Sequence, residues 1–141
     1  MAHRFPSEEW TAAFKDAVND NAAYRKAGAA WTHGAVAMVI AADPALGLEE
    51  PVGMILDVHG GQCRGAEYVR GMDAVAGVPF VIVAPRARWR EVIEGKLDPI
   101  KGMMEGKLKL TVGHLPTMIR YVESSRQLVV SAANVPTEFV E

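Results

Sequence analysis

The chain has 141 residues, of which 50% are hydrophobic and 23% are charged, and its formal net charge is -2. These values are typical of a globular protein and predict one domain, residues 1–141, with a hydrophobic core of its own. Lys and Arg are spread along the chain rather than clustered, so we expect no nucleic acid as a partner.

Nothing in the sequence predicts export or a membrane anchor. Residues 1–6 are polar and form no signal peptide, and the longest apolar run, 35–42, is too short to span a bilayer. The single cysteine, Cys63, cannot form an intramolecular disulfide. We therefore expect a cytoplasmic protein without stable membrane insertion.

Two helices are predicted near the start of the chain. Ser7 is a typical N-cap for the first, and Trp10 and Phe14 follow at the spacing that places side chains on one helix face. The Asn-Asp-Asn run at 19–21 ends this helix and can cap a second one over 22–27.

A buried strand and a β-hairpin are predicted next. The run 35–42 is continuously apolar, and Gly60-Gly61 separates two strand-like runs, 52–59 and 62–69. A two-residue turn fixes the register of the hairpin. The predicted pairs are His59–Gln62, Asp57–Arg64, Val58–Cys63 and Leu56–Gly65, and the last two face the core.

The segment 80–113 contains the tetrapeptide Glu-Gly-Lys-Leu twice, and each copy is typical of a helix end with glycine in the left-handed cap position. Asp98-Pro99, between the copies, predicts an N-cap and the first residue of a short helix. An apolar strand over 80–84, a helix after Pro85 and an alternating strand over 107–112 complete the segment.

The longest predicted helix starts at Pro116, and the tail 134–141 is expected to be irregular. Together these elements predict an α+β fold, in which a single five-stranded, mainly antiparallel sheet is covered by about five helices.

No arrangement of side chains indicates catalysis or metal binding. The four histidines, His3, His33, His59 and His114, lack the spacing of a metal site. Cys63 and His114 are the best candidates for an enzyme, but no base–nucleophile spacing supports one. We expect a protein that is not an enzyme and that holds neither a metal nor a cofactor.

Seven methionines are many for this length. Five of them fall on faces predicted to point inward: Met38, Met54, Met103, Met104 and Met118. Methionine fills irregular space and adapts to variable shapes, so the residues alone leave open an ordinary core or a binding cavity.

The segment 80–113 resembles the signature region of the sterol carrier protein type two family. The pattern of that family is an apolar strand, a helix with an aromatic residue, Gly-Lys-x-Asp-Pro, a short helix, and Gly-Lys-Leu-Lys-Leu followed by a glycine. This chain has Trp89 on the first helix, Gly-Lys-Leu-Asp-Pro at 95–99, Gly-Lys-Leu-Lys-Leu at 106–110 and then Gly113. The order of the flanking elements also agrees.

The resemblance implies a hydrophobic tunnel between sheet and helices that takes up sterols, fatty acids, acyl-CoA or phospholipids. The chain ends in Phe-Val-Glu rather than the Ser-Lys-Leu peroxisomal signal of eukaryotic members, which favours a prokaryotic stand-alone member. The residues expected to bind the ligand are Trp89, Met103, Met104, Leu108, Leu110, Leu115, Met118, Ile119 and Val122. Arg86, Arg88 and Lys101 either meet an acidic head group or lie on solvated helix faces.

The leading hypothesis is a non-enzymatic carrier of a lipid or another apolar small molecule. The alternative is a structural or interaction module with a collapsed cavity, which forms a homodimer or docks beside a lipid-metabolising enzyme.

Overall fold

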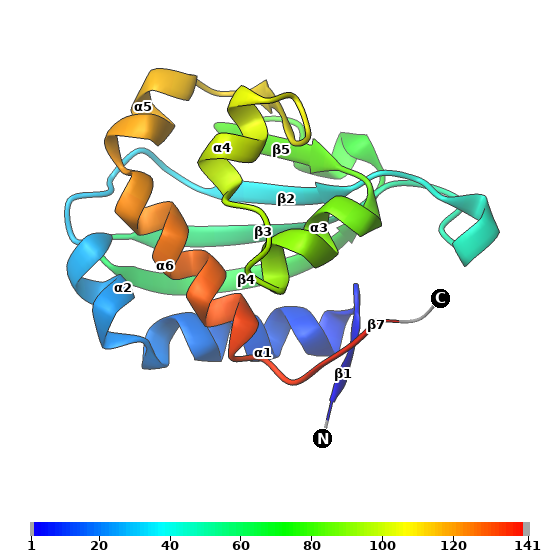
Figure 1. The fold of residues 1–141 in the computed structure, drawn as a ribbon, viewed down its shortest axis with the longest axis horizontal. Helices are drawn as coiled ribbons and strands as arrows, with labels where there is room; N and C mark the ends of the chain where they lie inside the picture. Colours follow the sequence, from blue (N-terminus) through cyan, green and yellow to red (C-terminus); the bar gives the residue numbers. More distant parts are fainter. Residues whose placement is uncertain (1, 140–141) are drawn as a thin grey trace.

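The computed structural model describes residues 2–139, and a five-stranded sheet with helices on one face forms its body (Figure 1). The strands are β1 (His3–Phe5), β2 (Val36–Ile40), β3 (Val52–His59), β4 (Gln62–Arg70), β5 (Phe80–Ala84), β6 (Lys109–Val112) and β7 (Thr137–Phe139). The α-helices are α1 (Glu8–Asp20), α2 (Ala22–Ala27), α3 (Arg86–Ile93), α4 (Pro99–Met104), α5 (Leu115–Arg120) and α6 (Val122–Ala133), and two short 3-10 turns are η1 (Pro44–Leu46) and η2 (Met72–Val75).

The strand order in the sheet is β4-β3-β2-β5-β6, and all neighbours are antiparallel except β2 and β5. The predicted α+β fold with a mainly antiparallel five-stranded sheet is confirmed. The two parallel strands lie side by side in the middle and are almost fully buried. Their continuous apolar sequences follow from this, because a strand covered on both faces has no polar alternation.

The hairpin of β3 and β4 turns at Gly60 and Gly61, which have φ angles of 59° and 85°. His59 pairs with Gln62 and Val58 with Cys63, as predicted. A bulge follows, so Leu56 pairs with Ala66, and the predicted pairing of Leu56 with Gly65 is wrong. A bulge adds one residue to one strand, and the strict alternation on which the prediction rested does not reveal it.

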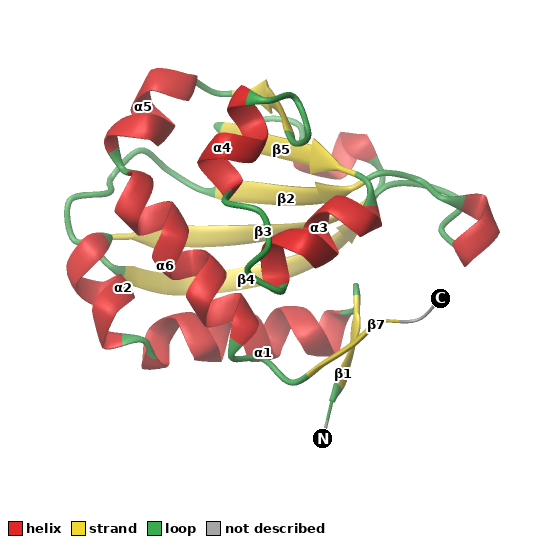
Figure 2. Cartoon of the chain, in the orientation of Figure 1, coloured by secondary structure: helices red, strands yellow, loops and turns green. Residues whose placement is uncertain are grey.

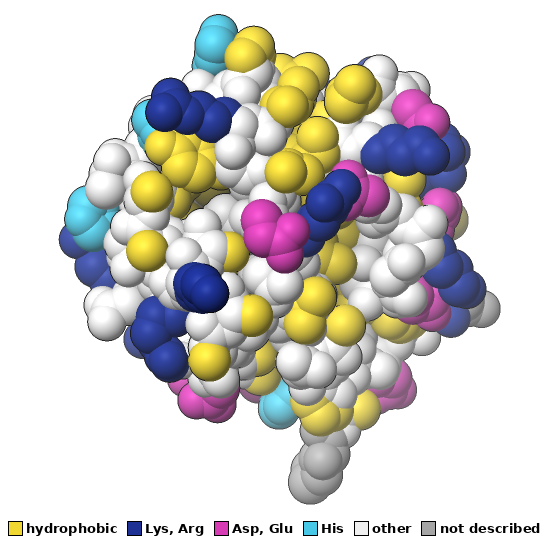
Figure 3. All heavy atoms as spheres, turned by 60° about the vertical axis from the view of Figure 1, so that its left-hand side comes forward, with side chains coloured by type: hydrophobic (Ala, Val, Ile, Leu, Met, Phe, Trp, Pro, Cys, Tyr) yellow, Lys and Arg dark blue, Asp and Glu magenta, His cyan; other side chains and the backbone are white. Residues whose placement is uncertain are grey.

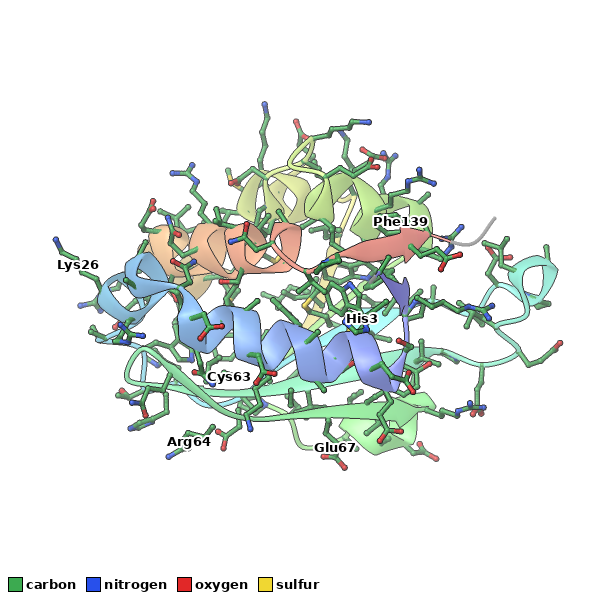
Figure 4. The ribbon with its side chains drawn as sticks, turned by 90° about the horizontal axis from the view of Figure 1, so that it is seen from below. His3, Lys26, Cys63, Arg64, Glu67 and Phe139 are labelled. Carbon is green, nitrogen blue, oxygen red and sulfur yellow. The ribbon has the colours of Figure 1, made fainter. Side chains whose placement is uncertain are left out.

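The helices form one layer on the inner face of the sheet (Figure 2). Viewed along the sheet, Arg64 and Glu67 extend from β4 on the side away from the α-helices, the side on which η2 lies (Figure 4). The larger hydrophobic cluster lies between sheet and helices, and a smaller one lies where Val75 of η2 packs against Ala37, Val39 and Val81. The main core is therefore the space between the sheet and the helical layer.

Two expectations for the C-terminal part are wrong. The helix expected from Pro116 is divided at Tyr121, whose ψ of 37° is not helical, into α5 and α6. The tail is not irregular over Thr137–Phe139, because this strand pairs in parallel with β1. The rings of Phe5 and Phe139 are 5.6 Å apart across the pair. Three-residue strands are too short to show a period of two. Residues 140–141 of the predicted tail lie outside the described residues.

The residues that end α3, begin α4 and end α4 have the conformations that the sequence predicts. Gly95 and Gly106 both have a φ of 78°, in the left-handed region that favours glycine. Asp98 Oδ2 accepts a 3.0 Å hydrogen bond from the backbone N–H of Lys101, and Pro99 begins the helix. Asp98 Oδ1 also accepts a 3.1 Å hydrogen bond from Arg126 Nε of α6. One carboxylate thus caps α4 and attaches it to α6.

We predict that Asp98→Ala lowers the free energy of unfolding by about 1 kcal/mol or slightly more, because the cap is lost together with a half-exposed ion pair. Asp98→Asn keeps a capping oxygen and is the matched control, with a loss below about 0.5 kcal/mol. Denaturant unfolding measures both. Equal losses for the two variants would show that the cap contributes little.

Candidate functional site: an apolar cavity under the helices

A cavity of about 60 Å³ lies in the main core, between the inner face of the sheet and helices α1, α3, α4, α5 and α6. Its lining comes from strands and helices that are far apart in the sequence. The lining residues are Phe14, Trp31, Val36, Met38, Leu56, Val58, Ile82, Trp89, Val92, Ile93, Pro99, Met103, Met118, Ser124, Ser125, Leu128, Val129 and Ala132. Sixteen of these eighteen residues are apolar or aromatic, so the cavity suits an apolar guest.

Both tryptophans of the lining use their indole N–H groups within the protein. Trp89 Nε1 donates a 2.8 Å hydrogen bond to the carbonyl oxygen of Val39, and Trp31 Nε1 donates a 2.9 Å bond to that of Gly34. These bonds fix the two rings and leave their apolar surfaces toward the cavity. Ser124 and Ser125, on the first turn of α6, bring the hydroxyl groups of the lining.

The hydroxyl of Tyr24, which is not part of the lining, lies near Ser124. Tyr24 is fully buried and its hydroxyl makes no hydrogen bond of acceptable geometry. Burial raises the pKa of Tyr24 to about 12, and Ser124 lies close enough to act against this rise. A buried hydroxyl without a hydrogen-bond partner is costly, so Tyr24 is a polar group of the core that remains unsatisfied in this structure.

The structure brings three of the nine predicted ligand-binding residues to the cavity: Trp89, Met103 and Met118. Leu108 is buried, but its side chain packs near Gly102 and is not part of the lining. The half-buried residues Leu110, Leu115 and Val122 pack against the core outside the lining.

Met104 and Ile119 lie on the surface, with 65% and 43% of their area exposed. The prediction that Met104 points inward is wrong, because Met103, the preceding residue of α4, takes the buried position and Met104 lies about 100° further around the helix. The face of the molecule shown in Figure 3 carries several such hydrophobic side chains among charged ones.

Sequence reasoning about the site missed the contributions of the first half of the chain. Met38 is predicted to point inward and Phe14 to share a helix face with Trp10, but no sequence signal connects either residue to the segment 80–113. Trp31 lies in a loop without periodicity, and its ring contacts Phe80 and Tyr121 at centroid distances of 5.2 and 5.3 Å. Such contacts depend on the tertiary fold and have no local signature.

The cavity is smaller than the tunnel that the sequence resemblance implied. An apolar cavity of about 150 Å³ is needed for a guest the size of benzene, so 60 Å³ holds no lipid without movement of the lining.

The candidate groups for catalysis lie apart from this cavity. Cys63 is buried, its thiol donates to the carbonyl oxygen of Gly65, and burial raises the pKa of that thiol. His114 Nδ1 lies 3.0 Å from Thr117 Oγ1 on the surface. Within residues 2–139, no three His, Cys, Asp or Glu side chains are grouped as metal ligands would be.

The three candidate head-group contacts also lie outside the cavity lining. Arg88 pairs with Glu91 at 2.9 Å, and Lys101 is exposed. Arg86 borders a separate cleft on the surface. In the described part of the chain, every helix is too short or too polar to cross a bilayer.

Solved structures resemble this fold closely. A crystal structure of sterol carrier protein 2 aligns with a TM-score of 0.85 and 37% identity, covering 92% of this chain and 97% of that one. A conserved hypothetical protein of Thermus thermophilus, described as a candidate sterol carrier protein, aligns with a TM-score of 0.85 and 36% identity over 94% and 90% of the two chains. Sterol carrier protein 2 of Yarrowia lipolytica, at 16% identity and a TM-score of 0.56 over 92% and 94%, shares the fold alone. No family model and no curated protein sequence matches the chain.

We predict that Tyr24 makes the stability of the protein fall at alkaline pH. An unfolded tyrosine loses its proton near pH 10, whereas the pKa of Tyr24 in the folded protein is about 12. The contribution is therefore fully present below pH 10 and is lost as the pH rises from 10 toward 12, by about 1.4 kcal/mol per pH unit. Tyr24→Phe removes this slope, and the difference between the two proteins in denaturant unfolding at several pH values measures it. If the free energy of unfolding falls equally with pH in the wild-type protein and in Tyr24→Phe, Tyr24 is not the group responsible.

Proposed function

Because this chain belongs to the sterol carrier protein 2 family, we propose that it is a non-enzymatic carrier of one apolar small molecule, held between its sheet and its helices. The observation that supports this best is the lining of the cavity, in which every side chain except two serines is apolar. Each methylene group that leaves water for such a lining contributes roughly 0.8 kcal/mol, before the costs of ordering are subtracted.

Binding requires the cavity to grow, and the lining supplies the means. Met38, Met103 and Met118 are unbranched and can adopt new rotamers with little strain. Met118 also lies on α5, which joins α6 at the non-helical residue Tyr121. We infer that the guest displaces these methionine side chains and enlarges the space between α4, α5 and the sheet.

The two serines of the lining favour an amphiphile over a plain hydrocarbon. Ser124 and Ser125 line the cavity, and Ser124 also lies near the unpartnered hydroxyl of Tyr24. A guest with a terminal hydroxyl or carboxyl group satisfies these groups, and a guest without one leaves them unpaired. The proposed ligand class is therefore a long-chain alcohol or fatty acid, or a sterol-like alcohol.

The small volume of the cavity favours a second candidate function, an interaction module whose core stays closed. Native mass spectrometry of the protein mixed with a long-chain fatty acid separates the two. The carrier retains one fatty acid per chain, whereas a module with a closed core retains none at any ratio.

We predict that Met118→Trp weakens binding of a fluorescent acyl probe by about tenfold or more, because the larger ring occupies the space meant for the guest. Met104→Trp is the matched control, since the same change at an exposed position leaves the cavity as it is. Circular dichroism checks that both variants fold. Equal probe affinities for the two variants would place the ligand elsewhere.

A further inference from the structure

A second concave site, a cleft of about 650 Å³, lies on the surface of the protein. None of its lining residues is shared with the apolar cavity. Strand β1, the start of α1, the end of β4 and the start of α3 meet there at one end of the sheet (Figure 1). Its positive groups are those of Arg4, Arg70 and Arg86, and its hydroxyl groups come from Ser7 and Tyr68.

The three arginines of this cleft make no ion pair with any described residue. Other arginines of the chain do so, including Arg64 with Asp57 at 3.0 Å and Arg88 with Glu91 at 2.9 Å. A guanidinium group offers five N–H donors and no acceptor, and it is normally paired where it is partly buried, as Arg86 is, whereas Arg4 and Arg70 are exposed. The cleft therefore gathers three guanidinium groups that no carboxylate of residues 2–139 neutralises at ion-pair distance.

Arg86 carries the strongest evidence for a missing partner. Its side chain is half-buried, and the Nη1 atom is fully buried without any hydrogen-bond partner. An N–H donor of a charged group in this situation costs more than almost any other unsatisfied group. Arg86 also lines the cleft, so a rotation of its guanidinium group would bring this unpaired donor to an acceptor bound there.

The pKa of Tyr68 indicates that Arg4 and Arg70 both lie near the hydroxyl group of this residue. Burial raises the pKa of the Tyr68 hydroxyl, and the charges of Arg70 and Arg4 act against this rise, so both lie within electrostatic reach of that hydroxyl. Tyr68 and Arg70 are alternate residues of β4 and share the face of the sheet that carries α1. A neutral O–H donor thus stands beside at least two guanidinium groups.

We propose that this cleft binds a phosphate group, carried by a soluble phosphorylated compound or by a phospholipid head group. Phosphate offers acceptor oxygens on several sides, and guanidinium groups bind them with two parallel N–H···O bonds. The site is distinct from the cavity of the proposed function, and its occupancy does not depend on an apolar guest.

Two acidic side chains limit the strength of this site. Glu8 and Glu9 also line the cleft, so its formal charge is +1, from three arginines and two glutamates. They repel a phosphate without occupying the arginines. Removing the charges of Glu8 and Glu9 therefore strengthens phosphate binding, whereas removing the charge of an arginine weakens it.

The test is a titration of the full chain with inorganic phosphate at low ionic strength, followed by NMR chemical shifts. The wild-type protein shows saturable shifts at the cleft. Arg86→Gln weakens binding by about tenfold or more, because a charge-assisted hydrogen bond is lost. Arg70→Gln, at an exposed strand end, gives an independent loss if Arg86→Gln fails to fold.

Two matched variants complete the titration. Arg64→Gln removes the same charge from the other end of β4 and leaves the affinity within about twofold. Glu8→Gln combined with Glu9→Gln tightens binding severalfold by relieving repulsion.

Sedimentation with phosphatidylcholine vesicles, with and without phosphatidic acid, distinguishes the two sources of phosphate. Retention that requires both phosphatidic acid and Arg86 identifies a lipid head group, and phosphate binding without retention identifies a soluble compound. The proposal is overturned if phosphate does not bind the folded protein, or if Arg86→Gln and Arg64→Gln behave alike. Binding of an acyl probe in the cavity is unchanged by Arg86→Gln, so failure here leaves the proposed function untouched.

Discussion

A buried hydrogen bond from the Trp89 indole to the carbonyl oxygen of Val39 holds the helical layer against the sheet at α3. It joins residues 50 positions apart and ties α3 to β2, a central strand of the sheet. Because the N–H group must reach this buried oxygen, the ring stands between the layers with its apolar surface toward the core. Trp89 also lines the apolar cavity, so the hydrogen bond that holds α3 against β2 positions one wall of that cavity.

Within the helical layer, α4 and α5 are joined to α6 by fewer polar links than the α1–α2 junction, where Asn21 donates hydrogen bonds to Gln127 and Ser131 of α6. Asp98 connects α4 to α6 through one partly exposed ion pair, and α5 joins α6 through the non-helical residue Tyr121. Exposed ion pairs contribute little to stability, and a helix of six residues is held mainly by packing. Helices α4 and α5, which carry Met103 and Met118, are therefore the part of the layer best able to move when the cavity fills.

The sequence predicted those elements that have local signatures. The hairpin turn at Gly60 and Gly61, the capping of α4 by Asp98, and the glycine caps at Gly95 and Gly106 all follow from the conformations those residues prefer. The bulge in β4, the break at Tyr121 and the pairing of β1 with β7 were not predictable, because they depend on packing between distant segments. For the same reason the sequence placed Trp89, Met103 and Met118 near the cavity but could not add Trp31 or Phe14, which only the tertiary fold brings there.

The central claim is that an apolar guest enters the space under the helices, and the methionine methyl groups test it directly. With a long-chain fatty acid bound to protein labelled at its methionine methyl groups, NMR measures nuclear Overhauser contacts between those methyl groups and the chain of the fatty acid. The account predicts contacts to Met38, Met103 and Met118, which line the cavity, and none to the exposed Met72 and Met104. Contacts confined to Met72 or Met104, or none at saturation, would contradict it.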